Sequence, residues 1–206
     1  NRMANFSSLG PPPRYQVKPD LVAVGEDIYT AQSGDEVDGT GLYQVTGGTS
    51  LSAPIVSGAA AVLRAARPGL PPRHYRSLLV NTATILEDDK GVPLPVMHQG
   101  GGRLNLARAL RAKVAASPVS VSFGAGTRNV NVTRPVLITN VGIYPDTFSL
   151  TANPAGAGPV PSITPATVQL SAGQSAVVTA RLSGTAPGPG EYQGYIHIQG
   201  TRPDSQ

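Results

Sequence analysis

The pattern of apolar and polar positions changes near Ala115. Before this point, two stretches have helical periodicity, and short apolar runs lie between polar or Gly-rich turns. After it, short segments with alternating apolar and polar residues are separated by Gly, Pro and Asn. These two periods are typical of helices and of half-buried strands. The pattern predicts an α/β part over residues 1–112 and an all-β part over residues 113–206.

The longest apolar stretch begins shortly after Ser50. Residues 55–63 are apolar on nearly every helical face, and the first charge is Arg64. Pro54 is expected in the first turn, where its missing N–H costs little, and Pro68 ends the helix. Because a helix that is apolar all round belongs inside a protein, we expect this helix to be buried.

The rest of the first part predicts two further helices and short strands. Helices are expected from Pro71 to about Thr84 and over Leu104–Ala112, and His74 is expected on the outer face of the first of them. The remaining elements expected are strands Leu21–Gly25 and Ile28–Gln32, the segment Leu42–Thr46 that leads into the turn before Ser50, and a polar connection or small hairpin over Glu87–Val96.

The second part predicts about seven short strands. Segments of this length with turn residues between them are typical of a β-sandwich. The expected strands are Val119–Phe123, Asn129–Val132, Val136–Asn140, Asp146–Ala152, Ala166–Leu170, Ala176–Leu182 and Tyr192–Gln199.

Composition excludes several classes of function. The 206 residues include no cysteine, which rules out disulfides, thiol nucleophiles and cysteine metal sites. The net charge is only +4 and the basic residues are scattered, so no nucleic-acid surface is expected. We expect no membrane span and find no signal-peptide pattern at the start, and we expect the sequence to be a fragment or a processed chain.

The loop Ser33–Gly41 carries three acidic residues, Asp35, Glu36 and Asp38. Three carboxylates in one loop could bind a hard cation such as calcium. Their spacing is not that of a known calcium loop, which favours a solvated loop instead. No cofactor is therefore expected in this chain.

The run Gly47–Pro54 places Ser50 at the start of the long apolar helix. Free N–H groups and the positive end of the helix dipole would face the group that a serine attacks, which suits the oxyanion of acyl transfer. The simpler alternative is that Thr49 or Ser50 is an N-cap.

The motif Gly48-Thr49-Ser50-x-Ser52-x-Pro54 resembles the nucleophile signature of the subtilisin-like serine proteases. Three more segments resemble that family in the same order, and the resemblance covers residues 4–112. Val24 departs from it, because the family usually has a proline there. The three segments are Asn5–Pro11, Lys18–Gly25 and Gly100–Asn105.

This resemblance implies a secreted, extracellular or cell-surface serine endopeptidase of the subtilase family that cleaves polypeptides through an acyl-enzyme on Ser50. It also implies that the aspartate and histidine of the triad lie in an N-terminal part outside this chain, as would calcium sites. No aspartate motif accompanies His74, His98 or His197. We therefore expect the chain alone to be inactive.

Residues 113–206 resemble the immunoglobulin- or fibronectin-III-like domains that often follow subtilase catalytic domains. Two alternatives to the C-terminal part of a protease remain open. The chain could be a non-catalytic binding or structural module with a relic nucleophile segment. It could also be one subunit of an endopeptidase whose halves stay associated.

Overall fold

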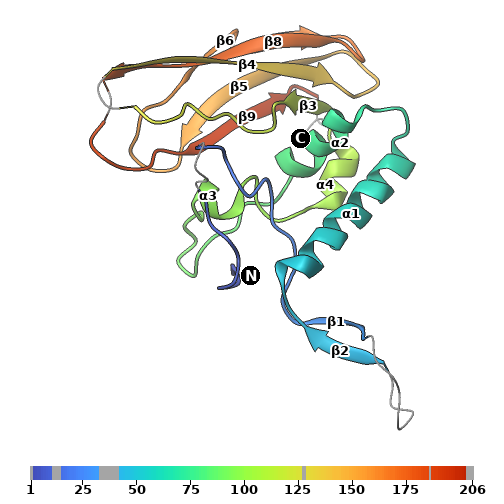
Figure 1. Cartoon of the computed structure of the whole chain (residues 1–206). Helices are drawn as coiled ribbons and strands as arrows, with labels where there is room; N and C mark the ends of the chain where they lie inside the picture. The colour runs from blue at the N-terminus through green and yellow to red at the C-terminus, as the bar shows by residue number, and fades with distance from the viewer. Residues whose placement is uncertain (1, 11–14, 33–41, 127–128, 186, 203–206) are drawn as a thin grey trace.

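In the computed structural model, the chain has a helix-rich part followed by a part made of strands (Figure 1). The structure describes residues 2–10, 15–32, 42–126, 129–185 and 187–202. The strands lie over one end of the helices, and a short hairpin projects at the opposite end. The mixture of helices and sheets predicted from the sequence is therefore present.

Proline residues and an asparagine cap mark where three of the helices in the described chain begin or end. The first helix ends before Pro68, and the second begins at Pro72, where the missing N–H of proline is tolerated. Asn105 caps the last helix, because its side chain accepts a hydrogen bond from the Arg108 amide at 3.1 Å. The helices are α1 (Thr49–Ala66), α2 (Pro72–Asn81), α3 (Val96–Gln99) and α4 (Leu106–Arg111).

The predicted strand Ile28–Gln32 is β1 (Ile28–Ala31), and it pairs antiparallel with β2 (Tyr43–Thr46), which was not predicted as a strand. The predicted strand Leu21–Gly25 is not a regular strand, because only Val22 makes an isolated parallel bridge, to Arg103. Glu87 bridges Pro93, as expected for a small hairpin in that connection, but the short helix α3 that follows was not predicted.

The strand part contains two antiparallel sheets. The first has the order β3-β4-β8-β6 and the second the order β7-β5-β9. Their strands are β3 (Val114–Ser117), β4 (Asn129–Asn140), β5 (Asp146–Pro154), β6 (Ser162–Thr164), β7 (Thr167–Leu170), β8 (Ser175–Thr185) and β9 (Gly194–Gly200).

Three of the strands predicted in this part differ from the structure. Val119–Phe123 forms no strand, and the strand that opens the sheet is β3. The predicted strands Asn129–Val132 and Val136–Asn140 are one continuous strand, β4, because Pro135 in its middle still fits the ladder. The short strand β6 was not predicted.

The two sheets share one hydrophobic core. Ile138 and Val178 come from the first sheet, and Phe148, Leu150 and Leu170 come from the second. Phe148 and Leu150 are two positions apart on β5, so the two-residue period directs both into the core. This alternation, already visible in the sequence, explains why the two sheets face each other.

The expectation that α1 is buried is wrong for this chain. Only Ala59 and Leu63 are buried on α1, where α2 and α4 cover one of its sides. Ile55 and Val62 stay 39% and 50% exposed. The helix is as apolar as its sequence indicates, but no other element of the described chain covers most of its surface.

The expectation that no apolar run could span a bilayer also needs correction. By length and composition alone, α1 is long and apolar enough to cross a membrane. Buried helices of water-soluble proteins meet the same criteria, so this finding by itself assigns no membrane.

Polar contacts tie the two parts together. The Arg67 guanidinium, just beyond α1, donates to the carbonyl oxygens of Ala112 and Val141, both at 2.7 Å. Partial burial lowers the pKa of this guanidinium. Ser77 on α2 accepts a hydrogen bond from the Ala116 amide on β3, and Tyr195 on β9 donates to the Gly100 carbonyl. The strand part is thus fixed to the helical part at several points.

We expect Gly100→Ala to lower the free energy of unfolding of the chain by about 2–4 kcal/mol. Gly100 has a φ of 60°, and an added Cβ would lie 2.2 Å from the Pro19 carbonyl oxygen. Urea unfolding measures the change. Gly58→Ala is the matched control, because no atom lies within 4 Å of its added Cβ, and it should stabilise α1 by about 0.5–1 kcal/mol. Equal effects of the two substitutions would contradict this packing.

Candidate active site

Ser50 is the second residue of α1 and its side chain is exposed. The N-cap is Gly48, whose φ of 151° favours glycine and which offers no capping side chain. The alternative that Thr49 or Ser50 serves as the N-cap is therefore wrong. A glycine cap leaves the Ser50 hydroxyl free of a capping role and open to solvent.

The first turn of α1 presents the positive end of the helix dipole. It contains no acidic residue, and no side chain caps its amides. The Leu51 amide donates to the Gly48 carbonyl at 3.0 Å, while the amides before it have no partner within the helix. Unpaired N–H groups and the helix dipole together suit a developing negative charge beside Ser50.

Pro54 lies in the second turn of α1, not in the first as expected. Its missing N–H would have bonded to the carbonyl of Ser50, four residues earlier. The proline therefore removes a helical hydrogen bond at the backbone of Ser50.

The segment Ala23–Gly25 lies directly against the turn before Ser50. The Gly48 amide donates to the Gly25 carbonyl at 2.7 Å. The Ser52 hydroxyl donates toward the carbonyls of Ala23 and Val24, at 3.2 and 3.1 Å. A Cβ on Gly25 would lie 2.3 Å from Ser52 Oγ and 3.0 Å from the Gly48 carbonyl oxygen, so a side chain there would displace the Ser52 hydroxyl. These contacts fix the first turn of α1.

The residues just before this segment, 20–22, pack against the triple glycine Gly100–Gly102. The Gly101 amide donates to the Asp20 carbonyl, and the Val22 amide donates to the Gly102 carbonyl, both at 2.9 Å. A Cβ on Gly101 would lie 2.3 Å from the Val80 carbonyl oxygen at the end of α2. The extended segment 18–25 is thus clamped between the triple glycine and the serine turn.

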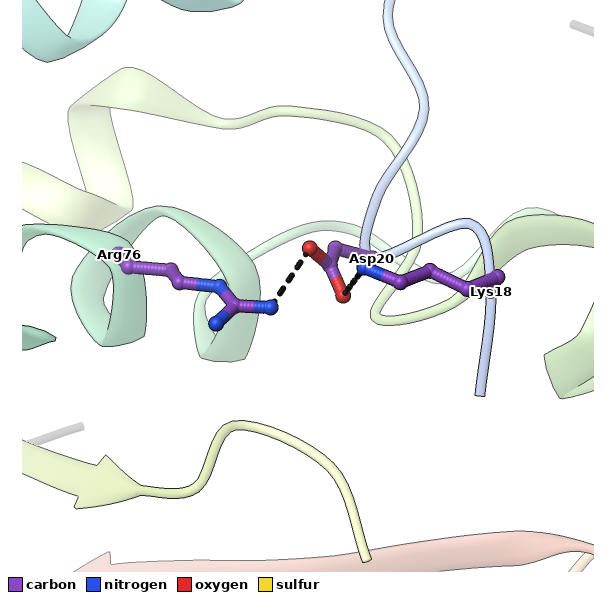
Figure 2. A network of polar contacts seen from close by, with 3 residues as sticks. All are labelled: Lys18, Asp20 and Arg76. Carbon is purple, nitrogen blue, oxygen red and sulfur yellow. Dashed lines mark hydrogen bonds and ion pairs between the residues drawn. The ribbon is translucent and has the colours of Figure 1, made fainter. Parts of the chain in front are cut away.

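Asp20 anchors this segment to α2 (Figure 2). Its carboxylate accepts from Lys18 at 3.0 Å and from Arg76 at 2.9 Å. Partial burial opposes ionisation, but the hydrogen bonds and charges of Lys18 and Arg76 outweigh it and hold the Asp20 pKa below its usual value. Asp20 is therefore an ion-paired structural residue, not a general base.

The structure brings together the four segments that carry the family resemblance. A Cβ on Gly47, beside the serine turn, would lie 3.8 Å from the ring of Phe6. The Gly10 amide donates to the Met97 carbonyl, next to the triple glycine. Pro11 lies outside the described residues. The contacts of Gly25 and Ser52 were not foreseen, although both residues stand inside the quoted motifs.

His74 does not lie on the outer face of α2, as the sequence predicted, but is 7% exposed. It shares a helix face with Ser77 and Leu78, which are also buried, although its neighbours in sequence are arginines. Its Nδ1 is buried without a hydrogen-bond partner. Burial, with the nearby Arg73 charge, lowers its pKa.

The other histidines lie on α3 (His98) and on β9 (His197). Both elements lie toward the strand part, whereas the first turn of α1 points toward the hairpin (Figure 1). The acidic loop Ser33–Gly41 lies outside the described residues. Among the residues that are described, no group of three or more His, Asp or Glu could hold a metal ion.

Chemically, this arrangement offers an exposed hydroxyl and a set of N–H donors on one rigid turn. A serine hydroxyl is a weak nucleophile unless a base accepts its proton. None of the described residues is placed to do so. The site can therefore supply the nucleophile and the anion-stabilising end of an acyl-transfer centre.

Comparison with known proteins gives one family. The subtilase family matches residues 1–126. The chain is 33% identical over 124 residues to the minor extracellular protease Vpr of Bacillus subtilis (strain 168), covering 60% of this chain and 15% of Vpr. It is 31% identical over 156 residues to the subtilisin-like protease SBT1.5 of Arabidopsis thaliana, covering 66% of this chain and 20% of that protein. The chain thus spans at most a fifth of these two relatives.

The buried histidine predicts a pH dependence of stability. Because the folded state lowers the His74 pKa below its ordinary value of 6.5, the unfolded state takes up a proton first as the pH falls. The stability that requires neutral His74 is complete above pH 6.5 and is lost below it, with a slope of up to about 1.4 kcal/mol per pH unit.

Urea unfolding of the chain at several pH values measures this slope. His74→Leu should remove the acid-sensitive step, whereas His197→Gln, which changes an exposed histidine, should keep it. An unchanged step in His74→Leu would assign it to another group.

Proposed function

We infer that this chain, which belongs to the subtilase family, is the nucleophile-bearing C-terminal part of a serine endopeptidase. The observation that carries this inference is the exposed Ser50 on the uncapped first turn of α1. The substrate class is polypeptide, as in the proteases that the chain resembles.

In the proposed reaction, Ser50 Oγ attacks the carbonyl carbon of the scissile peptide bond. Its proton passes to a histidine base, and the carbonyl oxygen becomes an oxyanion that accepts a hydrogen bond from the Ser50 amide. The base then protonates the leaving amine, and an acyl-enzyme remains on Ser50. Water releases the acyl group in a second step in which the same base removes a proton from water.

The histidine and its orienting aspartate belong, in this proposal, to an N-terminal part of the catalytic domain outside these residues. The exposed face of α1 supports this assignment, because Ile55 and Val62 offer an apolar surface to a covering partner. A helix with one covered side becomes a core helix once that part packs on it. The 206 residues alone are therefore expected to hydrolyse nothing.

For the strand part we propose an immunoglobulin- or fibronectin-III-like β-sandwich. Two antiparallel sheets that share one core support this proposal. The contacts from Arg67 and Tyr195 make it a support for the catalytic part and not a loosely tethered module.

We also propose that the protein acts outside the cell or at its surface. The name of the Bacillus relative describes that protein as an extracellular protease. A chain without cysteine carries no thiol that an oxidising environment would change, which is compatible with secretion.

Ser50→Ala in the protein that contains this chain should lower peptide hydrolysis by at least about four orders of magnitude, because the nucleophile is lost. The measurement is the rate of cleavage of a generic fluorogenic peptide. Ser57→Ala is the matched control, since Ser57 lies on the same helix and only bonds back to the Ala53 carbonyl. Activity retained by Ser50→Ala would contradict the proposal, because the nucleophile would then be another residue.

Val62→Lys should destabilise the whole protein by about 2–4 kcal/mol, because the N-terminal part would bury an unpaired charge. In the isolated chain, where Val62 is 50% exposed, the same substitution should change little. Thermal unfolding of both proteins measures the difference. Val177→Lys is the control, because Val177 is 56% exposed on β8, away from α1. Equal effects of Val62→Lys in both proteins would contradict a covering partner.

A further inference from the structure

The hairpin of β1 and β2 has an exposed apolar face. Cross-strand partners lie on the same face of a sheet, and the register pairs Tyr29 with Val45 and Ala31 with Tyr43. Tyr29, Tyr43 and Val45 are 69%, 60% and 65% exposed. The two tyrosine rings stack, with a centroid distance of 5.3 Å and an interplanar angle of 15°. We call these three exposed side chains the tyrosine face.

The chemistry of the tyrosine face differs from that of the exposed side of α1. The α1 side has aliphatic residues such as Ile55 and Val62, which are typical of a surface that stays buried once another part of the protein packs on it. Tyrosine is enriched where proteins bind a partner, because its ring is apolar and stiff while its hydroxyl tolerates water. The tyrosine face therefore suits reversible binding better than permanent burial.

The tyrosine face lies close to Ser50 along the chain. Only residues 47–49 separate the end of β2 from Ser50, and the first turn of α1 points toward the hairpin (Figure 1). An extended chain spans at most about 3.6 Å per residue, so the Cα atoms of Val45 and Ser50 lie within about 18 Å of each other. An extended substrate covers that distance in about five residues. A polypeptide held at Ser50 can therefore reach the tyrosine face.

We propose that the tyrosine face binds the polypeptide substrate and selects chains with an aromatic or large aliphatic side chain about five to seven residues from the scissile bond. That side chain packs against the stacked rings of Tyr29 and Tyr43 and against Val45. The proposal rests on the proposed function, because the occupant is the polypeptide that Ser50 cleaves. Tyr29, Tyr43 and Val45 are thus specificity-determining residues of the same site.

The size of the tyrosine face also favours a substrate over a second copy of this chain. Three side chains of this kind expose at most about 400 Å². Stable protein complexes bury about 800 Å² on each partner. A short extended segment needs less area than a dimer, because its cleavage site is held at Ser50 as well.

The test compares the hydrolysis of two quenched fluorogenic peptides by the protein that contains this chain. Both peptides have the same cleavable centre, which is extended at each end by GSFSFSG in the aromatic peptide and by GSSSSSG in the polar peptide. The kcat/KM of the aromatic peptide should exceed that of the polar peptide by at least about fivefold, because its phenylalanines bury apolar surface on the tyrosine face. The difference should lie mainly in KM, since this contact is remote from the reacting bond.

Two double variants test the residues of the tyrosine face. Tyr29→Ser with Tyr43→Ser should bring the ratio of the two kcat/KM values to about one, because both rings are lost. Tyr29→Phe with Tyr43→Phe keeps both rings and should retain the ratio. Because the ratio compares two peptides on one variant, any change in the reactivity of Ser50 cancels.

Gln44→Ser is the matched control for these variants. Gln44 is exposed on β2 between Tyr43 and Val45, but its side chain lies on the opposite face of the hairpin. This variant should retain the preference for the aromatic peptide.

A ratio near one in the unchanged protein, or a preference that the serine double variant retains, would overturn the proposal. Failure of the proposed function is a separate result, because Ser50→Ala would then still cleave both peptides. The N-terminal part is the other possible occupant of this face. If it covered the tyrosine face, the serine double variant would lower the thermal stability of the whole protein but not that of the isolated chain, and this result would also overturn the proposal.

Discussion

Close backbone contact along residues 18–25 is the constraint on which the site depends. This extended segment has the triple glycine on one side and the serine turn on the other, and glycine is required on both sides. Side chains at Gly25, Gly100 or Gly101 would each lie within about 2.3 Å of another group. The Asp20 ion pairs then fix the segment to α2. The position of Ser50 is therefore set by backbone packing, with Ser52 as the main side-chain contact.

In the proposed enzyme, this arrangement would hold Ser50 in place without contacts from the rest of the catalytic centre. The first turn of α1 is fixed to Ala23–Gly25, while the far end is tied to the strand part through Arg67. The helix is held at both ends but covered on only one side. Under the proposal that an N-terminal part packs on α1, one explanation would account for both its apolar exposed side and its unassisted serine.

Periodicity and turn residues predicted most elements of the fold. The three longer helices, strand β1 and the major strands of the second part were found because their apolar spacing and their glycines and prolines are local signals. Val119–Phe123 was predicted as a strand from the same alternation, but a strand also needs a paired neighbour, which the pattern cannot reveal. The predictions of burial were wrong in both directions, because α1 is more exposed and His74 more buried than the sequence indicated. The exposure of a side chain depends on which elements cover it, and sequence spacing does not determine that.

The central claim is that Ser50 is the nucleophile of a larger enzyme, and its most direct test is labelling by a fluorophosphonate probe. The probe should modify Ser50 in the protein from its native source, at one label per chain, and should leave the isolated 206 residues unlabelled. Digestion and mass spectrometry would locate the label. Labelling at another serine, or no labelling of a native protein that still cleaves peptides, would contradict the account.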